Sequence, residues 1–185
     1  MSSKREQLIE TAIELFAKNG FHATGIDTIL AHAGVAKKTL YTHFRTKEEL
    51  ILAALRQHDG QFRNQLMKSV DELADTPKGK LLAIFDVSRN WFSQNNFYGC
   101  MFINAIGEYS EKDTAIREVC KEYKRLMRNY MTNLAEQAGI EEAEELANEL
   151  SLLLEGSIVT AQVSELSEQA ADTAKRAAKR LIDAY

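Results

Sequence analysis

Apolar residues recur at steps of three and four along nearly the whole chain, and this spacing constrains the fold more than any other feature. A first example is the set Leu8, Ile9, Ala12 and Ile13 within residues 3–19. Such spacing places apolar side chains on one face of an α-helix, whereas a half-buried strand needs alternation with a period of two. No segment shows that alternation, a hairpin dipeptide or an internal repeat. The sequence therefore predicts an all-α fold.

Start and stop signals divide the chain into about nine helices. Gly20 ends the first, and Thr24 or Gly25 is expected to cap the second. Thr46-Lys47-Glu48-Glu49 is a capping box, Thr76-Pro77 opens the fifth helix, and Ser110-Glu111-Lys112-Asp113 is expected to cap the seventh. The expected helices are residues 3–19, 26–32, 37–42, 46–73, 77–92, 101–108, 110–139, 141–163 and 168–184.

Composition places the chain among ordinary globular proteins. Of its 185 residues, 45% are hydrophobic and 27% charged. No apolar run approaches the roughly 20 residues of a membrane span, and the chain starts without the apolar stretch of a signal peptide. We therefore expect a cytoplasmic protein with no membrane partner. Residues 1–60 carry a net charge of +1 and the remainder carries −5, an asymmetry too small to indicate nucleic acid by itself.

Motifs for catalysis and metal binding are missing from the sequence. There is no G-x-S-x-G, H-E-x-x-H, G-x-G-x-x-G or P-loop pattern. The two cysteines lack CxxC spacing, and His22, His32, His43 and His58 lack ligand spacing. We expect no enzyme, no metal and no cofactor.

The most informative segment is residues 20–50. Two short helices separated by a turn with Gly34 match a helix-turn-helix, whose second helix enters the DNA major groove. The blocks GFHATGID (20–27), AGVAKKTLYTHF (33–44) and TKEEL (46–50) resemble the N-terminal domain of the TetR/AcrR family of bacterial transcriptional regulators. Ala36 stands where the family usually has a serine, which removes an N-cap hydroxyl worth about 1 kcal/mol.

The resemblance implies two domains, a helix-turn-helix domain of residues 1–46 and a larger helical domain of residues 47–185 for ligand binding and dimerisation. The long helix from Thr46 connects them. The implied function is a ligand-responsive repressor that binds a pseudo-palindromic operator in double-stranded DNA as a homodimer. A small hydrophobic or aromatic effector releases it. Two alternatives stay open: an all-α binding protein that acts without DNA, and an activator or global regulator with no small ligand.

Eight residues are predicted to contact DNA. Lys47 has an independent argument, because a cation at the N-terminus of a capped helix opposes the helix dipole, and a bound phosphate removes that conflict. For Tyr41 and His43 a structural role is the alternative. The predicted groove and flanking contacts are Lys37, Lys38, Thr39, Tyr41 and His43, and the predicted phosphate contacts are Thr24, Gly25 and Lys47.

The second part of the chain is rich in aromatic, sulfur-containing and amide side chains. This composition is typical of an apolar ligand pocket with a few polar groups, and an ordinary hydrophobic core is the alternative. The predicted pocket residues are Trp91, Phe92, Phe97, Tyr98, Cys100, Met101, Asn104, Tyr123, Met127, Tyr130 and Gln162. Cys100 is expected at a helix N-terminus, where the dipole would stabilise a reactive thiolate sensor; a small buried hydrophobe is the other interpretation.

Small residues in stripes along helices eight and nine permit close helix approach. They predict a homodimer through a four-helix interface, with packing inside one chain as the alternative. The stripe residues are Ser157, Ala161, Ala170, Ala171, Ala174, Ala177 and Ala178.

Overall fold

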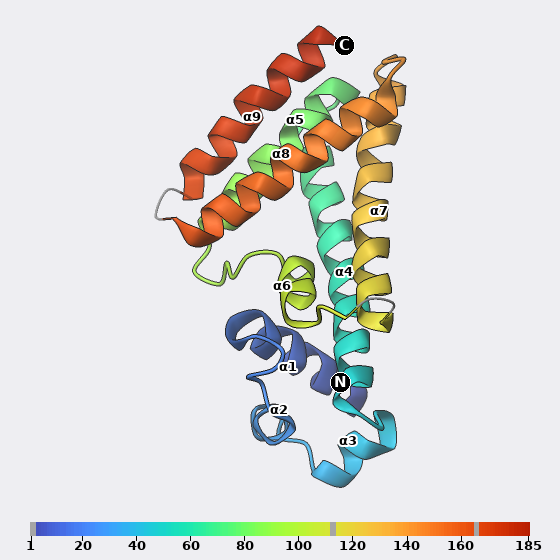
Figure 1. Cartoon of the computed structure of the whole chain (residues 1–185), viewed down its shortest axis with the longest axis vertical. Helices are drawn as coiled ribbons and strands as arrows, with labels where there is room; N and C mark the ends of the chain where they lie inside the picture. The colour runs from blue at the N-terminus through green and yellow to red at the C-terminus, as the bar shows by residue number, and fades with distance from the viewer. Residues whose placement is uncertain (1–2, 112–113, 165–166) are drawn as a thin grey trace. The chain divides into compact units, whose positions relative to one another are not determined.

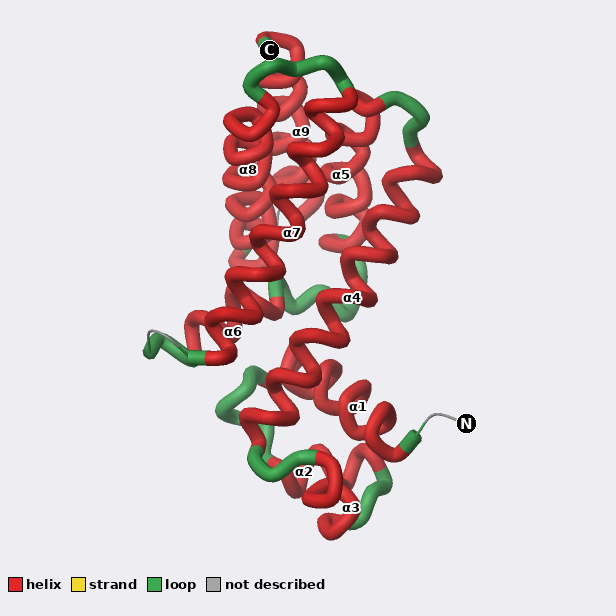
Figure 2. Tube along the Cα trace, turned by 90° about the vertical axis from the view of Figure 1, so that its right-hand side faces the viewer, coloured by secondary structure: helices red, strands yellow, loops and turns green. Residues whose placement is uncertain are grey.

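The computed structural model describes residues 3–111, 114–164 and 167–185, which form nine helices and no strand (Figures 1 and 2). This confirms the all-α prediction. Within these ranges, no helix combines the length and the apolar character needed to cross a membrane. The helices are α1 Lys4–Asn19, α2 Ile26–Ala33, α3 Lys37–His43, α4 Lys47–Leu73, α5 Pro77–Phe92, α6 Met101–Glu108, α7 Ala115–Gln137, α8 Ala143–Val163 and α9 Ser167–Ala184.

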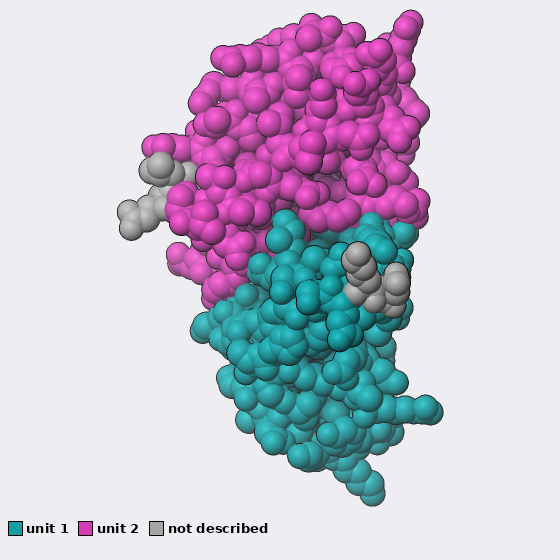
Figure 3. Space-filling model, viewed as in Figure 1, with its two compact units in different colours: residues 1–61, 101–123 teal, residues 62–100, 124–185 magenta. Residues whose placement is uncertain are grey.

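The chain forms two compact units (Figure 3). The first consists of residues 1–61 and 101–123 and contains α1, α2, α3 and α6 with parts of α4 and α7. The second consists of residues 62–100 and 124–185 and contains α5, α8 and α9 with the remaining parts of α4 and α7. These units describe packing, and the functional boundary between residues 46 and 47 stays a prediction.

The capping residues explain where the helices of the first unit begin. Ser3 closes a capping box on α1, with its Oγ accepting from the Glu6 backbone N–H at 3.2 Å. Thr46 Oγ1 accepts from the Glu49 N–H at 3.2 Å, as its sequence pattern predicts. The Glu49 carboxylate, however, accepts from the backbone N–H of Arg45 at 2.7 Å, one residue before the expected donor. The Thr46 hydroxyl satisfies an N–H group that the first turn of α4 leaves unpaired, and the Glu49 carboxylate satisfies an N–H group just before the helix.

The structure decides one expected boundary and corrects another. Of the two residues expected to cap the second helix, Gly25 is the N-cap of α2, without a side-chain capping bond. The expectation that Ser110 begins the seventh helix is wrong, because α7 starts at Ala115 and Thr114 Oγ1 accepts from the Arg117 N–H at 3.3 Å. Lys112 and Asp113, also in the expected cap, lie outside the described residues.

The core of the first unit fixes α2 and α3 on α1. Phe16 and Phe21 are fully buried and stack with ring centroids 5.0 Å apart. The apolar side chains of the two short helices and of the segments that flank α3 are buried, and they are Ile29, Val35, Leu40 and Phe44. Burial of each such side chain contributes about 1.5–3 kcal/mol. The short α2 and α3 therefore depend on tertiary packing for their stability.

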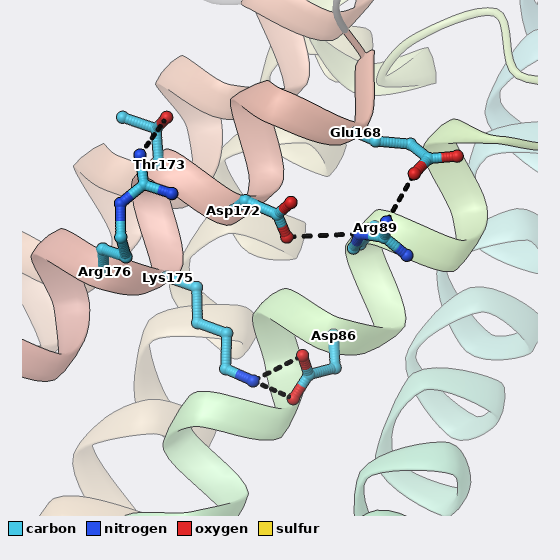
Figure 4. Close-up of polar contacts among 7 residues, drawn as sticks. All are labelled: Asp86, Arg89, Glu168, Asp172, Thr173, Lys175 and Arg176. Carbon is cyan, nitrogen blue, oxygen red and sulfur yellow. Dashed lines mark hydrogen bonds and ion pairs between the residues drawn. The ribbon is translucent and has the colours of Figure 1, made fainter.

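In the second unit, α9 packs against both α5 and α8. Polar contacts join α5 to α9 (Figure 4). The Lys175 ammonium lies 2.6 and 2.7 Å from the two carboxylate oxygens of Asp86. Arg89 binds Glu168 and, at 3.2 Å, Asp172. Opposite charges thus fix the register of α9 on α5.

We expect the substitution Asp86→Ala to lower the free energy of unfolding by about 1 kcal/mol or less, because solvent screens a half-exposed ion pair. A double-mutant cycle with Lys175→Ala, measured by urea unfolding, isolates the pair. The exposed pair Lys179–Asp183 within α9 is the control and should give a smaller coupling energy. A coupling energy of zero for Asp86 and Lys175 would show that this contact does not stabilise the fold.

Candidate nucleic-acid interface

The interface is built on the turn between α2 and α3. Gly34 ends α2 with a left-handed backbone, φ +61°, which favours glycine. Ala36 is the N-cap of α3 and makes no side-chain capping bond, as its sequence predicts. Leu40 anchors the inner face of α3 in the core, so the opposite face points to solvent. This is the geometry of a helix that can enter a DNA groove.

The residues predicted on the recognition face lie at the surface. Lys37, Lys38 and His43 are exposed and Thr39 is half-buried. Tyr41 is 49% exposed, which excludes a fully buried anchoring role for its ring. The Lys37 ammonium lies 3.2 Å from a carboxylate oxygen of Asp27, an exposed ion pair that a DNA contact would have to replace. The individual DNA contacts of these side chains stay predictions.

One predicted phosphate contact needs correction. The Thr24 side chain is buried, and its hydroxyl donates to the carbonyl oxygens of Gly20 at 2.7 Å and Leu15 at 3.2 Å. It therefore ties the end of α1 to the start of the next turn and is not free to contact phosphate. Gly25, in contrast, is exposed.

Lys47 is half-buried in the first turn of α4. Its ammonium lies 3.4 Å from the carbonyl oxygen of His22. Within the described ranges it forms no ion pair, so its charge is not neutralised by a carboxylate there. The position beside a helix N-terminus keeps Lys47 a candidate phosphate contact.

Sequence reasoning missed Glu108, the last residue of α6. Its carboxylate accepts from the backbone N–H groups of Phe21 at 2.7 Å and His22 at 2.6 Å. The same carboxylate lies 3.1 Å from His22 Nδ1, and the ring of Tyr109 lies 4.6 Å from the His22 ring. We call this cluster of Glu108, Tyr109, Phe21 and His22 the α6 clamp. It holds the turn that leads from α1 into the helix-turn-helix.

The predicted pocket residues are distributed over both compact units. Met101, Asn104 and Tyr123 belong to the first unit, where Tyr123 stacks on Phe102 with ring centroids 3.8 Å apart. The others belong to the second, where Trp91, Phe92 and Phe97 form an aromatic cluster with centroids 4.9 to 5.6 Å apart. Gln162 Nε2 donates to the Tyr98 carbonyl oxygen at 3.2 Å. The pocket itself stays a prediction.

Tyr130 has the properties of a polar group inside such a pocket. Its hydroxyl is buried and has no hydrogen-bond partner among the described residues. Burial, with a smaller effect from the charge of Asp71, raises the pKa of Tyr130 to about 12. The phenol is therefore neutral at physiological pH, and a buried hydroxyl without a partner is costly unless a ligand or water pairs with it.

Two sequence features, the Cys100 thiol and the four histidines, raise the question of a reactive sensor or a metal site. Cys100 is buried directly before α6, which shields its thiol from a reagent in solution and favours the core interpretation. Among the described residues, no group of three or more His, Cys, Asp or Glu side chains is arranged to hold a metal ion.

Comparison with known proteins gives consistent matches. Residues 8–54 match the family model described as bacterial regulatory proteins, tetR family. The regulator YerO of Bacillus subtilis is 39% identical over 82 residues, which are 44% of this chain and 28% of YerO. The regulator LmrA of Bacillus subtilis is 27% identical over 159 residues, 84% of each chain. Three curated relatives that match the N-terminal part, YerO among them, are covered over only 25% to 41% of their lengths.

Solved structures extend the likeness to the whole chain. A TetR-family transcriptional regulator from Streptomyces coelicolor superposes with a TM-score of 0.89 and 26% identity, covering 98% of this chain and 95% of that one. The matched proteins are regulators of transcription, which confirms the expectation that the chain is not an enzyme. Residues 8–54 thus form a DNA-binding helix-turn-helix domain of the tetR type, and the fold of the chain is the one that solved TetR-family regulators adopt.

Proposed function

We propose that the protein is a ligand-responsive repressor that binds a pseudo-palindromic operator as a homodimer. The exposed face of α3, set on a buried core, is the observation that carries this proposal. Lys37, Lys38, Thr39, Tyr41 and His43 read the major groove and its edges. Gly25 and Lys47 contact phosphates.

An exposed apolar face on α8 supports dimerisation. Leu152 is 73% exposed and Val163 is 79% exposed, and Val159 lies between them at helical spacing. With Gly156 they share one face, because 152, 156, 159 and 163 are separated by steps of three and four. A groove of about 480 Å³ continues this face onto α9 along Ala170, Thr173 and Ala177. A second copy of the chain would cover both helices.

The small-residue stripe divides between two roles. Ala171, Ala174 and Ala178 are buried within the single chain, as are Ser157 and Ala161. These residues pack α9 and α8 inside the protomer, so intrachain packing explains this part of the stripe. Two other stripe residues, Ala170 and Ala177, are only half-buried and line the groove next to the exposed side chains of α8. They are the stripe residues that a second copy could contact.

The ligand response would use the aromatic second unit and the α6 clamp. A hydrophobic or aromatic effector that contacts the Trp91 cluster and pairs with the Tyr130 hydroxyl would favour one conformation over another. A shift of α6 would pull on Phe21 and His22 through Glu108. In-vitro transcription from a promoter that carries the selected operator separates the alternatives, since a repressor lowers the yield and an activator raises it.

Two lysine substitutions test the DNA contacts. Lys47→Ala should weaken binding to every DNA sequence and flatten the plot of log affinity against log salt by up to about two units per dimer. Lys37→Ala should weaken operator binding more than binding to random DNA, because a groove-facing lysine reads guanine edges worth about 1–3 kcal/mol. The measurement is a salt titration of fluorescence anisotropy on both DNAs. An unchanged slope removes Lys47 from the phosphate contacts, and equal losses on both DNAs remove Lys37 from the specificity residues.

A further inference from the structure

The first compact unit contains a groove that the helix-turn-helix motif does not explain. It has a volume of about 570 Å³ and lies between α1, the end of α3 and α4. Arg5, His43 and Arg56 are among its lining residues, one from each of the three helices. We call it the arginine groove. All three side chains are exposed, so a ligand can reach them from solvent.

The arginine groove carries an excess of positive charge. Glu49 is the one carboxylate among its lining residues, against two guanidinium groups, and it accepts a hydrogen bond from the backbone N–H of Arg45 at 2.7 Å. In the part of the chain that the structure describes, neither Arg5 nor Arg56 forms an ion pair. The Arg5 guanidinium lies over the Phe44 ring, 5.4 Å from its centroid, and this cation–π contact positions it at the groove. Two guanidinium groups without carboxylate partners favour an anionic ligand.

The arginine groove and Lys47 lie on opposite faces of α4. Arg56 follows Lys47 by nine residues, about two and a half helical turns, so the two side chains leave α4 on opposite faces. An α-helix with its side chains is roughly 10–12 Å wide and fills a major groove about 12 Å wide. With α3 in a major groove, a sugar-phosphate strand would run along each side of it. If Lys47 contacts one strand, the opposite face of α4, which carries the arginine groove, is the one left for the other strand.

We propose that the arginine groove binds backbone phosphates of the second DNA strand, with Arg5 and Arg56 as donors and His43 at the rim. A guanidinium is planar and offers paired donors that match phosphate oxygens. Such contacts fix the orientation of the protein on the duplex without reading sequence. This inference rests on the proposed DNA-binding function and extends it by a second set of phosphate donors, Arg5 and Arg56, which lie outside α2 and α3.

The test compares Arg5→Ala, Arg56→Ala and the double variant with the wild type in salt titrations on a selected operator and on random DNA. Each single substitution should flatten the salt slope by about 0.9 per lost phosphate, up to about 1.8 per dimer, and weaken both DNAs equally. Lys18→Ala is the matched control, because it removes one exposed positive charge from α1 outside the groove. It should leave the slope unchanged. Circular dichroism and thermal unfolding confirm that each variant is folded.

Uncharged methylphosphonates at single backbone positions locate the contact. The wild type should lose affinity at positions on the second strand, and the double variant should lose nothing further there. Titration with inorganic phosphate, followed by the arginine Nε resonances, tests for a free-anion site. A double variant that is folded, has an unchanged DNA slope and no longer responds to phosphate would overturn the proposal. The wild type and Lys47→Ala show whether such a result also affects the proposed function. If the wild type binds operator and Lys47→Ala flattens the salt slope, the DNA-binding function stands and only the role of the arginine groove is rejected.

Discussion

Replacing Leu152 and Val159 by glutamate is expected to convert the protein to a monomer and to weaken operator binding by about two orders of magnitude or more. Both side chains lie on the exposed apolar face of α8. In a dimer the carboxylates would be buried against a second apolar face, which is strongly unfavourable. Loss of the dimer removes the avidity of two linked reading helices, an effect of about 10² to 10⁴. Sedimentation equilibrium and operator binding measure the two outcomes.

Leu73→Glu is the control for this experiment. Leu73 is an exposed leucine at the end of α4, so the same change should leave the assembly intact. Ala174→Glu and Ala178→Glu are unsuitable, because both alanines are buried inside the protomer and the substitutions would disrupt its own packing. A dimer that survives both α8 substitutions would place the interface elsewhere.

Glu108→Ala is expected to lower the free energy of unfolding by about 2 kcal/mol. The substitution leaves the N–H groups of Phe21 and His22 without their acceptor, and each unsatisfied buried donor costs about 1–3 kcal/mol. The expected loss is near the low end of the sum for two buried donors, because the hydrogen bond to the His22 N–H is exposed to solvent. Operator affinity should fall as well, because the released turn carries the His22 carbonyl that Lys47 contacts.

Urea unfolding monitored by circular dichroism and an operator titration measure this prediction. Glu108→Gln keeps one acceptor oxygen and should give an intermediate loss. Glu111→Ala, an exposed carboxylate three residues later, should change neither quantity. Wild-type stability and affinity in Glu108→Ala would show that the α6 clamp neither supports the turn nor positions the interface.

The sequence predicts the features that depend on neighbouring residues. Helical spacing and caps place α1, α4 and α5, because an N-cap such as Ser3 or Thr76 acts on residues within one turn. The core positions Ile29 and Leu40 follow from the same spacing. Because the apolar side of the short helix α3 packs into the core, its polar side must face solvent, and the sequence predicts this exposed face as well.

Features that join distant segments are not readable in this way. Glu108 is separated from Phe21 by 87 residues, and no local pattern marks an acidic residue at a helix end as the acceptor for another turn. Arg5 and Arg56 meet at one groove only after α1 folds onto α4. The polar side chain of Thr24 predicts a surface contact. In the structure it is buried at the end of α1, and its hydroxyl donates to backbone carbonyl oxygens. Small residues on α9 likewise indicate close packing without naming the partner.

Hydroxyl-radical footprinting of the wild type on DNA that it selects from a random library tests whether α3 reads sequence. Backbone protection is expected on both strands of each half-site, arranged with two-fold symmetry and with half-site centres separated by a whole number of helical turns. Protection should weaken uniformly in Lys47→Ala. Selection that returns no common sequence, with protection no stronger than on random DNA, would contradict the assignment of α3 as a sequence-reading helix.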